Sequence, residues 1–213
     1  MSALFYILLV MFFTKVPGFA KIFFPPDIIW EIDTHDKKIF LTFDDGPLPE
    51  VTPQVLDLLD DYEAKASFFM VGENAARSPA LVEEIFKRGH RVGNHGHNHL
   101  NGWKTPDKVY VDNVKKAAEH IPSKLFRPPY GKIKPRQARL LSGDFKIVMW
   151  SVLSGDFDRK KTPEQCFEAV KNNLKPGAVV VFHDSIKAKE NMLPALEKTL
   201  RMLKREGWSF GLL

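Results

Sequence analysis

Residues 39–47 read IFLTFDDGP, an apolar run that ends in two aspartates and a Gly-Pro pair. The run predicts a buried strand, and the Asp-Gly-Pro that follows predicts a turn at its end. Adjacent side chains of a strand point to opposite faces, so Asp44 and Asp45 can serve one site only if the turn re-aims one of them. The Gly-Pro pair is expected to make that turn. Taken alone, the two aspartates also fit a solvated strand end.

The rest of the chain alternates short apolar runs with amphipathic stretches, which predicts strands at 67–71, 125–126, 146–152 and 178–182. Helices are predicted from Thr52, with Thr52 as N-cap, and at 78–88, 109–120, 135–141, 162–173 and 193–205. This alternation implies parallel pairing with right-handed crossovers. About seven strand–helix units fit after residue 38, fewer than the eight of a full barrel. We therefore expect an α/β fold, a reduced or distorted βα barrel, with a doubly wound open sheet as the alternative.

Composition limits the function classes. The 213 residues suit one domain, with 44% hydrophobic and 27% charged residues. The net charge of +5 is spread along the chain rather than clustered, which argues against nucleic-acid binding. The single cysteine, Cys166, excludes an internal disulfide and a cysteine-based zinc knuckle.

The N-terminus, residues 1–24, is treated separately because it holds an unbroken apolar run of 11 residues, 3–13. A membrane-spanning helix needs about 20 residues, so the run is too short to cross a bilayer. It fits a signal peptide or membrane anchor, a mis-assigned start ahead of Met11, or a packed segment. Membrane association through this segment therefore stays open. A cell-envelope or exported location is favoured slightly over a cytoplasmic one.

Ionisable side chains follow most of the predicted strands, at the ends where βα folds carry their active sites. These groups are Asp44 and Asp45, the histidines of 95–99, Arg127, Asp156, and His183. Five strand ends with such groups predict one shared site.

Three histidines occur within five residues, at positions 95, 97 and 99. Imidazole is a standard zinc ligand, and a carboxylate can complete a three-ligand set, so the loop predicts a metal site. The spacing alone leaves open which two histidines bind, and a histidine-rich surface loop is the alternative. Arg127 follows a predicted strand in the stiff segment Arg-Pro-Pro-Tyr-Gly, where its guanidinium could clamp a carboxylate.

Taken in order, these segments resemble the polysaccharide deacetylase family, the NodB-like carbohydrate esterases of family 4. Its five motifs occur in their usual sequence between Thr42 and His183, among them TFDDGP at 42–47, GNHGHNH at 93–99 and RPPYG at 127–131. The resemblance implies a distorted (β/α)₇ barrel, with residues 25–213 as the catalytic domain. It also implies an N-acetylated glycan as substrate, which would lose acetate. The sequence does not indicate which glycan.

The resemblance also implies residue roles. Asp45, His95 and His99 would bind a divalent metal, usually zinc, which makes His97 a non-ligand. Catalytic roles fall to Asp44 as general base, Arg127 holding it, His183 as general acid, and the Tyr130 backbone N–H as a donor to the oxyanion.

The sequence departs from the family pattern at three positions. Gly96 replaces a serine or threonine in the metal loop, which could loosen it, and Val181 replaces a leucine of the acetyl pocket. Leu153 stands where the family carries an aspartate that tunes the acid histidine, and Asp156 is a candidate substitute. This last departure keeps two alternatives open. One is a catalytically weak carbohydrate-binding protein on the same fold, and the other is a hydrolase of O-acetyl esters or cyclic amides.

Overall fold

The computed structural model describes residues 28–213. The N-terminal segment 1–24 and the domain boundary at residue 25 lie outside the described residues. Within the described part, no helix combines the length and the apolar character needed to cross a membrane.

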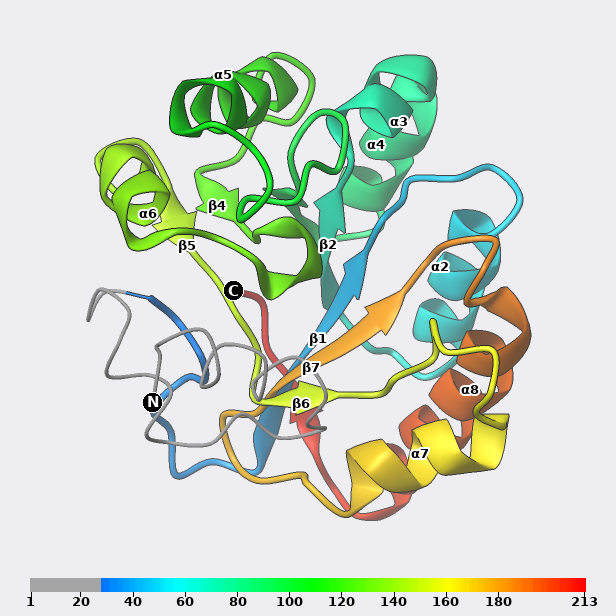
Figure 1. Ribbon diagram of the computed structural model, residues 1–213. Helices are drawn as coiled ribbons and strands as arrows, with labels where there is room; N and C mark the ends of the chain where they lie inside the picture. The colour runs from blue at the N-terminus through cyan, green and yellow to red at the C-terminus, as the bar shows by residue number, and fades with distance from the viewer. Residues whose placement is uncertain (1–27) are drawn as a thin grey trace.

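Strands and helices alternate along the chain (Figure 1). The strands are β1 (Lys38–Asp44), β2 (Ala66–Met70), β3 (Arg91–Asn94), β4 (Leu125–Phe126), β5 (Lys146–Ile147), β6 (Val152–Leu153), β7 (Val179–His183) and β8 (Ser209–Phe210). The helices are α2 (Thr52–Asp61), α3 (Gly72–Arg77), α4 (Pro79–Lys87), α5 (Asp107–Ala117), α6 (Pro135–Leu141), α7 (Pro163–Lys171) and α8 (Lys189–Arg205), with a 3₁₀ turn at Pro129–Gly131.

The sheet runs in the order β5-β4-β3-β2-β1-β7-β6, with β8 beside β1, and its ladders are parallel. Its two edge strands, β5 and β6, are consecutive in the chain. The helices lie around the outside of this curved sheet (Figure 1). The predicted distorted βα barrel is confirmed, and the open doubly wound sheet is not formed.

The predicted single strand at 146–152 is wrong in one respect. Its first part, β5, pairs with β4, whereas its last part, β6, pairs with β7 at the opposite edge of the sheet. Between them, the carbonyls of Val148 and Met149 accept hydrogen bonds from the buried guanidinium of Arg127. The segment therefore runs from one edge of the sheet to the other instead of forming a single strand.

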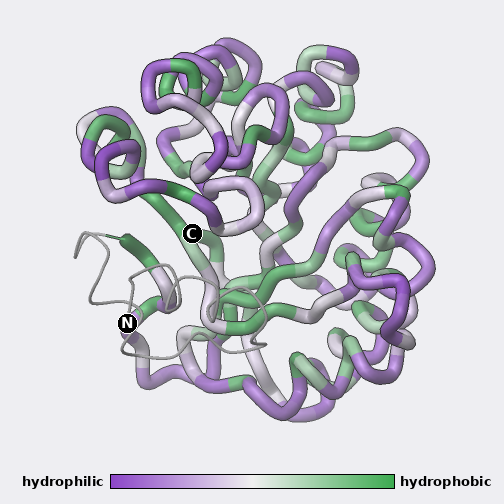
Figure 2. Tube along the Cα trace, in the orientation of Figure 1, coloured by the Kyte–Doolittle hydropathy of each residue, from purple (hydrophilic) through white to green (hydrophobic). Residues whose placement is uncertain are grey.

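Alternate side chains of β1 pack into two different hydrophobic clusters, one on each face of the sheet. Ile39, Leu41 and Phe43 pack outward against the helices, in the layer between sheet and helices. Phe40 packs with the residues that fill the barrel interior, and Thr42 and Asp44 share its face of the strand. The apolar strands lie at the centre of the molecule and polar residues cover much of the helices (Figure 2). Asp44 thus points into the barrel at the carboxyl end of β1.

The predicted cap at Thr52 is wrong. Val51 is the N-cap of α2 and makes no side-chain cap hydrogen bond. The Thr52 hydroxyl instead donates to Asp184 Oδ2 at 2.6 Å and accepts from the backbone N–H of Leu48. At the start of α7, Thr162 does cap its helix, with Gln165 completing a capping box.

Candidate active site

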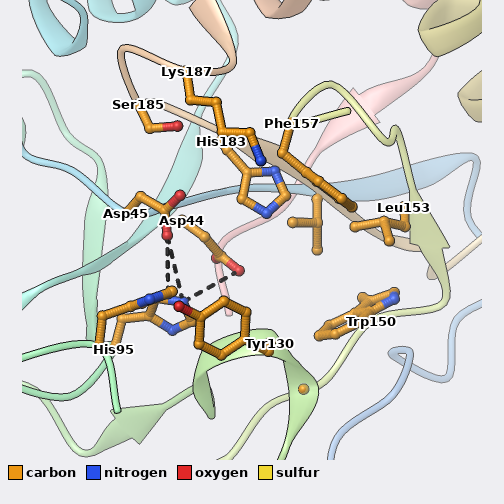
Figure 3. Close-up of a pocket in the computed structure, with 13 residues that line it drawn as sticks. Asp44, Asp45, His95, Tyr130, Trp150, Leu153, Phe157, His183, Ser185 and Lys187 are labelled. Atoms are coloured by element: carbon orange, nitrogen blue, oxygen red, sulfur yellow. Dashed lines mark ion pairs between the residues drawn. The ribbon is translucent and has the colours of Figure 1, made fainter. Parts of the chain in front are cut away.

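A pocket of about 440 Å³ opens at the carboxyl ends of the strands (Figure 3). This volume falls within the usual range for small-molecule sites. Its lining combines titratable groups on one side with apolar groups on the other: Asp44, Asp45, His95, His99, Tyr130, Gly131, Trp150, Leu153, Phe157, Val181, His183, Ser185 and Lys187. Of the residues to which the family resemblance gives a role, all except Arg127 and Asp156 line it. Arg127 bonds Asp44 and Asp156 bonds His183, so each supports a residue of the lining.

Asp44 and Arg127 form a buried ion pair. Arg127 Nη1 donates to Asp44 Oδ1 at 2.6 Å, and the guanidinium is fully buried. The same nitrogen donates to Thr42 Oγ1, so the guanidinium is held by the strand that carries Asp44. Burial lowers the pKa of Arg127, and the Asp44 carboxylate opposes this effect. The pair therefore fixes the Asp44 carboxylate in one orientation at the pocket floor.

Asp45 reaches the same pocket because its own backbone turns. Its φ is 87°, in the left-handed region, and the side-chain amide of Asn74 donates to its carbonyl at 2.8 Å. The re-aiming expected of the Gly-Pro pair thus starts one residue earlier. His99 and Tyr130, also in the pocket, have positive φ as well. Such conformations are costly and cluster at functional sites.

Asp45, His95 and His99 offer three ligand atoms that lie within 4.8 Å of one another. Asp45 Oδ1 lies 3.2 Å from His99 Nε2 and 3.8 Å from His95 Nε2. Ligand atoms about 2.1 Å from a tetrahedral zinc ion lie about 3.4 Å apart, so the set fits a divalent cation. His97 is not part of this set. Its ring lies against His120, 5.8 Å away between ring centroids.

The chemistry of the donors also fits a metal. His95 Nδ1 hydrogen bonds the carbonyl of Arg127 at 2.7 Å, which leaves Nε2 to face Asp45. Burial lowers the pKa of His95 to about 4, against the raising effect of Asp44, so the imidazole is neutral at pH 7. Burial alone would raise the pKa of Asp45, but the hydrogen bond with His99 and the nearby histidines hold it below its usual range.

His183 and Asp156 form the second polar pair. His183 Nδ1 lies 2.7 Å from Asp156 Oδ1, and the His183 backbone N–H donates to Asp156 Oδ2 at 2.8 Å. Asp156 is fully buried. Burial lowers the pKa of His183, but Asp156, followed by Asp45 and Asp44, raises it to about 9. Asp156 thus supplies the carboxylate that Leu153 cannot, and Leu153 is part of the apolar wall.

Register explains why the two catalytic candidates meet. Asp44 at the end of β1 pairs with His183 at the end of β7, so their side chains leave neighbouring strands on the same face. Tyr130 lies across the pocket with its ring against His99, 4.5 Å between ring centroids.

Asp184 is a supporting residue that the sequence analysis missed. Its Oδ1 accepts from the backbone N–H of Gly46 at 3.0 Å, and a Cβ at Gly46 would lie 2.0 Å from Oδ2. Burial raises the pKa of Asp184 to about 8, even though Thr52 and the Gly46 N–H lower it. Its place next to His183 was the available signal. Asp184 and Gly46 together fix the turn that follows Asp45.

The loop 95–99 carries two of the three candidate metal ligands. Two asparagines that the sequence analysis also missed hold its backbone by hydrogen bonds. Asn113 Oδ1, from α5, accepts from the backbone N–H groups of His97 and Asn98 at 2.9 and 3.2 Å. Asn94 Oδ1 accepts from Gly96 N–H at 2.7 Å. Gly96 has a φ of 74°, and a Cβ there would lie 3.3 Å from Asn113 Oδ1. Glycine therefore allows the backbone to approach Asn113. The hydrogen bonds to Asn113 hold this loop, which was expected to be loosened by the glycine in place of serine or threonine.

Asn113→Ala is expected to weaken divalent-metal affinity by about tenfold, because the backbone between His95 and His99 loses its acceptor. Alanine favours helices, so α5 itself should remain. Calorimetric titration of the metal-free protein with zinc measures the effect. Asn172→Ala, at an exposed asparagine that bonds Glu168, is the matched control. Equal affinities in the two variants would contradict this role of Asn113.

Comparison with known proteins identifies the family. The polysaccharide deacetylase family matches residues 31–144. A peptidoglycan-N-acetylglucosamine deacetylase of Bacillus cereus is 37% identical over 190 residues, which cover 86% of this chain and 89% of that protein. The crystal structure of a peptidoglycan N-acetylglucosamine deacetylase with a bound N-oxidanyl-benzamide superposes with a TM-score of 0.83 at 32% identity, covering 88% of this chain and 91% of that one.

A CE4 family pseudoenzyme from Bacillus anthracis has the same fold, with a TM-score of 0.77 at 22% identity, covering 89% of this chain and 68% of that one. The fold by itself therefore says nothing about activity, which must be argued from the site residues. The family match, the relatives and the site geometry agree on one assignment: this chain belongs to the polysaccharide deacetylase family.

Proposed function

We propose that the protein is a metal-dependent hydrolase that removes N-acetyl groups from the N-acetylglucosamine residues of peptidoglycan. The observation that carries the proposal is the arrangement of two polar pairs around one candidate metal site. Asp44, held by Arg127, lies beside the Asp45–His95–His99 set, with its Oδ2 3.9 Å from His95 Nε2. His183 lines the same pocket, and Asp156 bonds it from behind the lining.

An amide needs help at both ends, since its carbonyl is a poor electrophile and its nitrogen a poor leaving group. Asp45, His95 and His99 would hold a divalent cation, which would supply Lewis acidity toward a water and the acetyl carbonyl. In the proposed reaction Asp44 takes a proton from the attacking water. The water oxygen bonds to the acetyl carbon and the electrons of the carbonyl double bond move onto its oxygen. When that double bond forms again, the carbon–nitrogen bond breaks.

His183 gives the departing nitrogen its proton, so the products are acetate and the amino sugar. The Nδ1 atom of His183 faces Asp156, which leaves Nε2 as the atom that donates. We assign the Tyr130 backbone N–H to stabilising the oxyanion. The apolar wall of Trp150, Leu153 and Val181 suits the acetyl methyl group. A peptidoglycan substrate would place the enzyme outside the cytoplasmic membrane, in line with the envelope location expected from the sequence.

The test is to measure acetate and primary amine released from peptidoglycan and from chitooligosaccharides. An N-deacetylase releases the two products in equal amounts. Acetate without new amine would identify an O-acetyl esterase. Binding of the glycan without either product would identify a catalytically weak carbohydrate-binding protein.

Asp156→Asn is expected to move the alkaline limb of the kcat/KM profile to lower pH by about one unit or more. A general acid works in its protonated form, so activity falls as pH rises through the pKa of His183, which Asp156 helps to raise to about 9. Asparagine keeps a hydrogen-bond acceptor but not the charge, so that pKa falls. Asp158→Asn, at a nearby aspartate that bonds Lys160 N–H, is the control. An unchanged alkaline limb in Asp156→Asn would remove His183 from the acid role.

A further inference from the structure

Lys187 is a charged residue of the pocket lining that has no part in the proposed chemistry. Lys187 follows β7 and lines the pocket together with the catalytic candidates. Figure 3 shows its side chain extending toward His183 and Phe157. Its Nζ lies 5.8 Å from the centroid of the Phe157 ring, and that ring packs against His183 with 5.0 Å between centroids. The ammonium group is thus held on the His183 side of the pocket.

Among the described residues, the ammonium group of Lys187 has no counter-ion. In residues 28–213 its side chain makes no hydrogen bond or ion pair, and its recorded partner is the Phe157 ring. Lys189, two residues further on and outside the pocket lining, instead donates to the Glu50 carbonyl. An ammonium that lines a pocket without a carboxylate partner is available for a ligand anion.

Its position indicates which part of a substrate it meets. In the proposed reaction His183 protonates the nitrogen that leaves with the sugar, while the acetyl methyl lies against the apolar wall of Leu153 and Val181. A cation on the His183 side therefore faces the glycan rather than the acetyl group. Chitin-like glycans are neutral. In peptidoglycan the sugar next to each N-acetylglucosamine bears a lactyl ether. Its carboxylate is free in strands without peptides and is amide-linked where a peptide is attached, and the peptides carry carboxylates of their own.

We infer that Lys187 is a specificity-determining residue that binds a carboxylate on the glycan next to the sugar being deacetylated, which makes anionic peptidoglycan strands better substrates than neutral chitooligosaccharides. This inference rests on the proposed function and names its substrate class more closely. The contact forms at the pocket rim, so it should weaken as salt screens it.

The experiment measures kcat/KM for four glycans of equal length: peptide-free peptidoglycan strands, the same strands with peptides, strands whose carboxylates are converted to methylamides, and chitooligosaccharides. The readout is the ratio of the anionic to the neutral value. A change in the acid strength of His183 would alter all four rates together and would not change this ratio.

Lys187→Met is expected to lower the ratio by about three- to tenfold, and Lys187→Arg should retain most of it. Lys189→Met, two residues away and outside the pocket lining, should leave the ratio unchanged. A preference for peptide-free strands that methylamidation abolishes would identify the lactyl carboxylate. A preference confined to peptide-bearing strands would identify the peptide carboxylates.

An equal loss on charged and neutral glycans in Lys187→Met would overturn the inference and leave the deacetylase proposal intact. Wild-type protein that releases no acetate from any of the four glycans would overturn both. Wild-type protein that shows no preference for the charged strands would overturn the inference alone.

Discussion

Asp44→Asn is expected to lower kcat for acetate release by about 10²- to 10⁴-fold while the protein still binds its metal. The reason is that asparagine cannot take a proton from water, whereas Asp44 does not belong to the three-ligand set. One atom of the candidate metal site, His95 Nε2, lies 3.9 Å from Asp44 Oδ2. Acetate release and zinc titration of the same preparation measure the two effects.

Asp45→Asn is the matched variant, one residue further along the chain. It should lose activity together with metal affinity, because Asp45 supplies the carboxylate ligand. The two substitutions are thus expected to differ: Asp44→Asn lowers activity alone, whereas Asp45→Asn lowers both activity and metal affinity. Full activity in Asp44→Asn would contradict its role as base, and loss of metal in Asp44→Asn would make it a ligand instead. Circular dichroism of both variants checks that they fold.

Arg127→Met is expected to lower the free energy of unfolding by about 3–5 kcal/mol. The guanidinium is fully buried and bonds Asp44, Thr42 and two backbone carbonyls. Its loss leaves the Asp44 carboxylate buried without its cation. Urea unfolding followed by circular dichroism measures the change.

Arg88→Met is the comparison for this effect. Arg88 contacts three carboxylates, those of Asp57, Asp60 and Glu84, where Arg127 contacts one, but the Arg88 side chain is 27% exposed. Water can replace part of what is lost, so a cost of about 1 kcal/mol or less is expected. Equal costs for the two arginines would contradict the importance of burial at Arg127. Asp44→Asn combined with Arg127→Met should cost less than the sum of the two single changes.

The fold was predictable where local pattern and environment agree. The apolar run 39–43 and the breaker after it define β1, and the alternation of strands and helices predicts the parallel βα barrel. The last helix begins at Lys189, before its predicted start at 193, and the short helix α3 was not predicted. Pattern could not show that 146–152 divides between two edges of the sheet, because the hydrogen bonds at the point of division come from Arg127, which is distant in sequence.

The residue types of the candidate site could be predicted from the sequence, but the contacts that hold those residues in place could not. The carboxylates, histidines and arginine stand at strand ends, so the sequence indicates that they meet. The partners that fix them are side-chain contacts over long sequence separations, such as Thr52 with Asp184 and Asn113 with the 97–98 backbone. No motif encodes these contacts. Asp156 was nominated as an ionisable group at a strand end and as a substitute for the carboxylate that Leu153 lacks, and the geometry of its bond to His183 supports that choice.

The most direct test of the central claim is a titration of metal-stripped protein with zinc, in which acetate release from peptidoglycan is followed against equivalents added. We expect no release without metal and a linear rise that ends at one equivalent per chain. A variant with both His95→Ala and His99→Ala should bind no zinc at this site and should stay inactive throughout. Full acetate release by the stripped protein, or by that variant, would contradict the account.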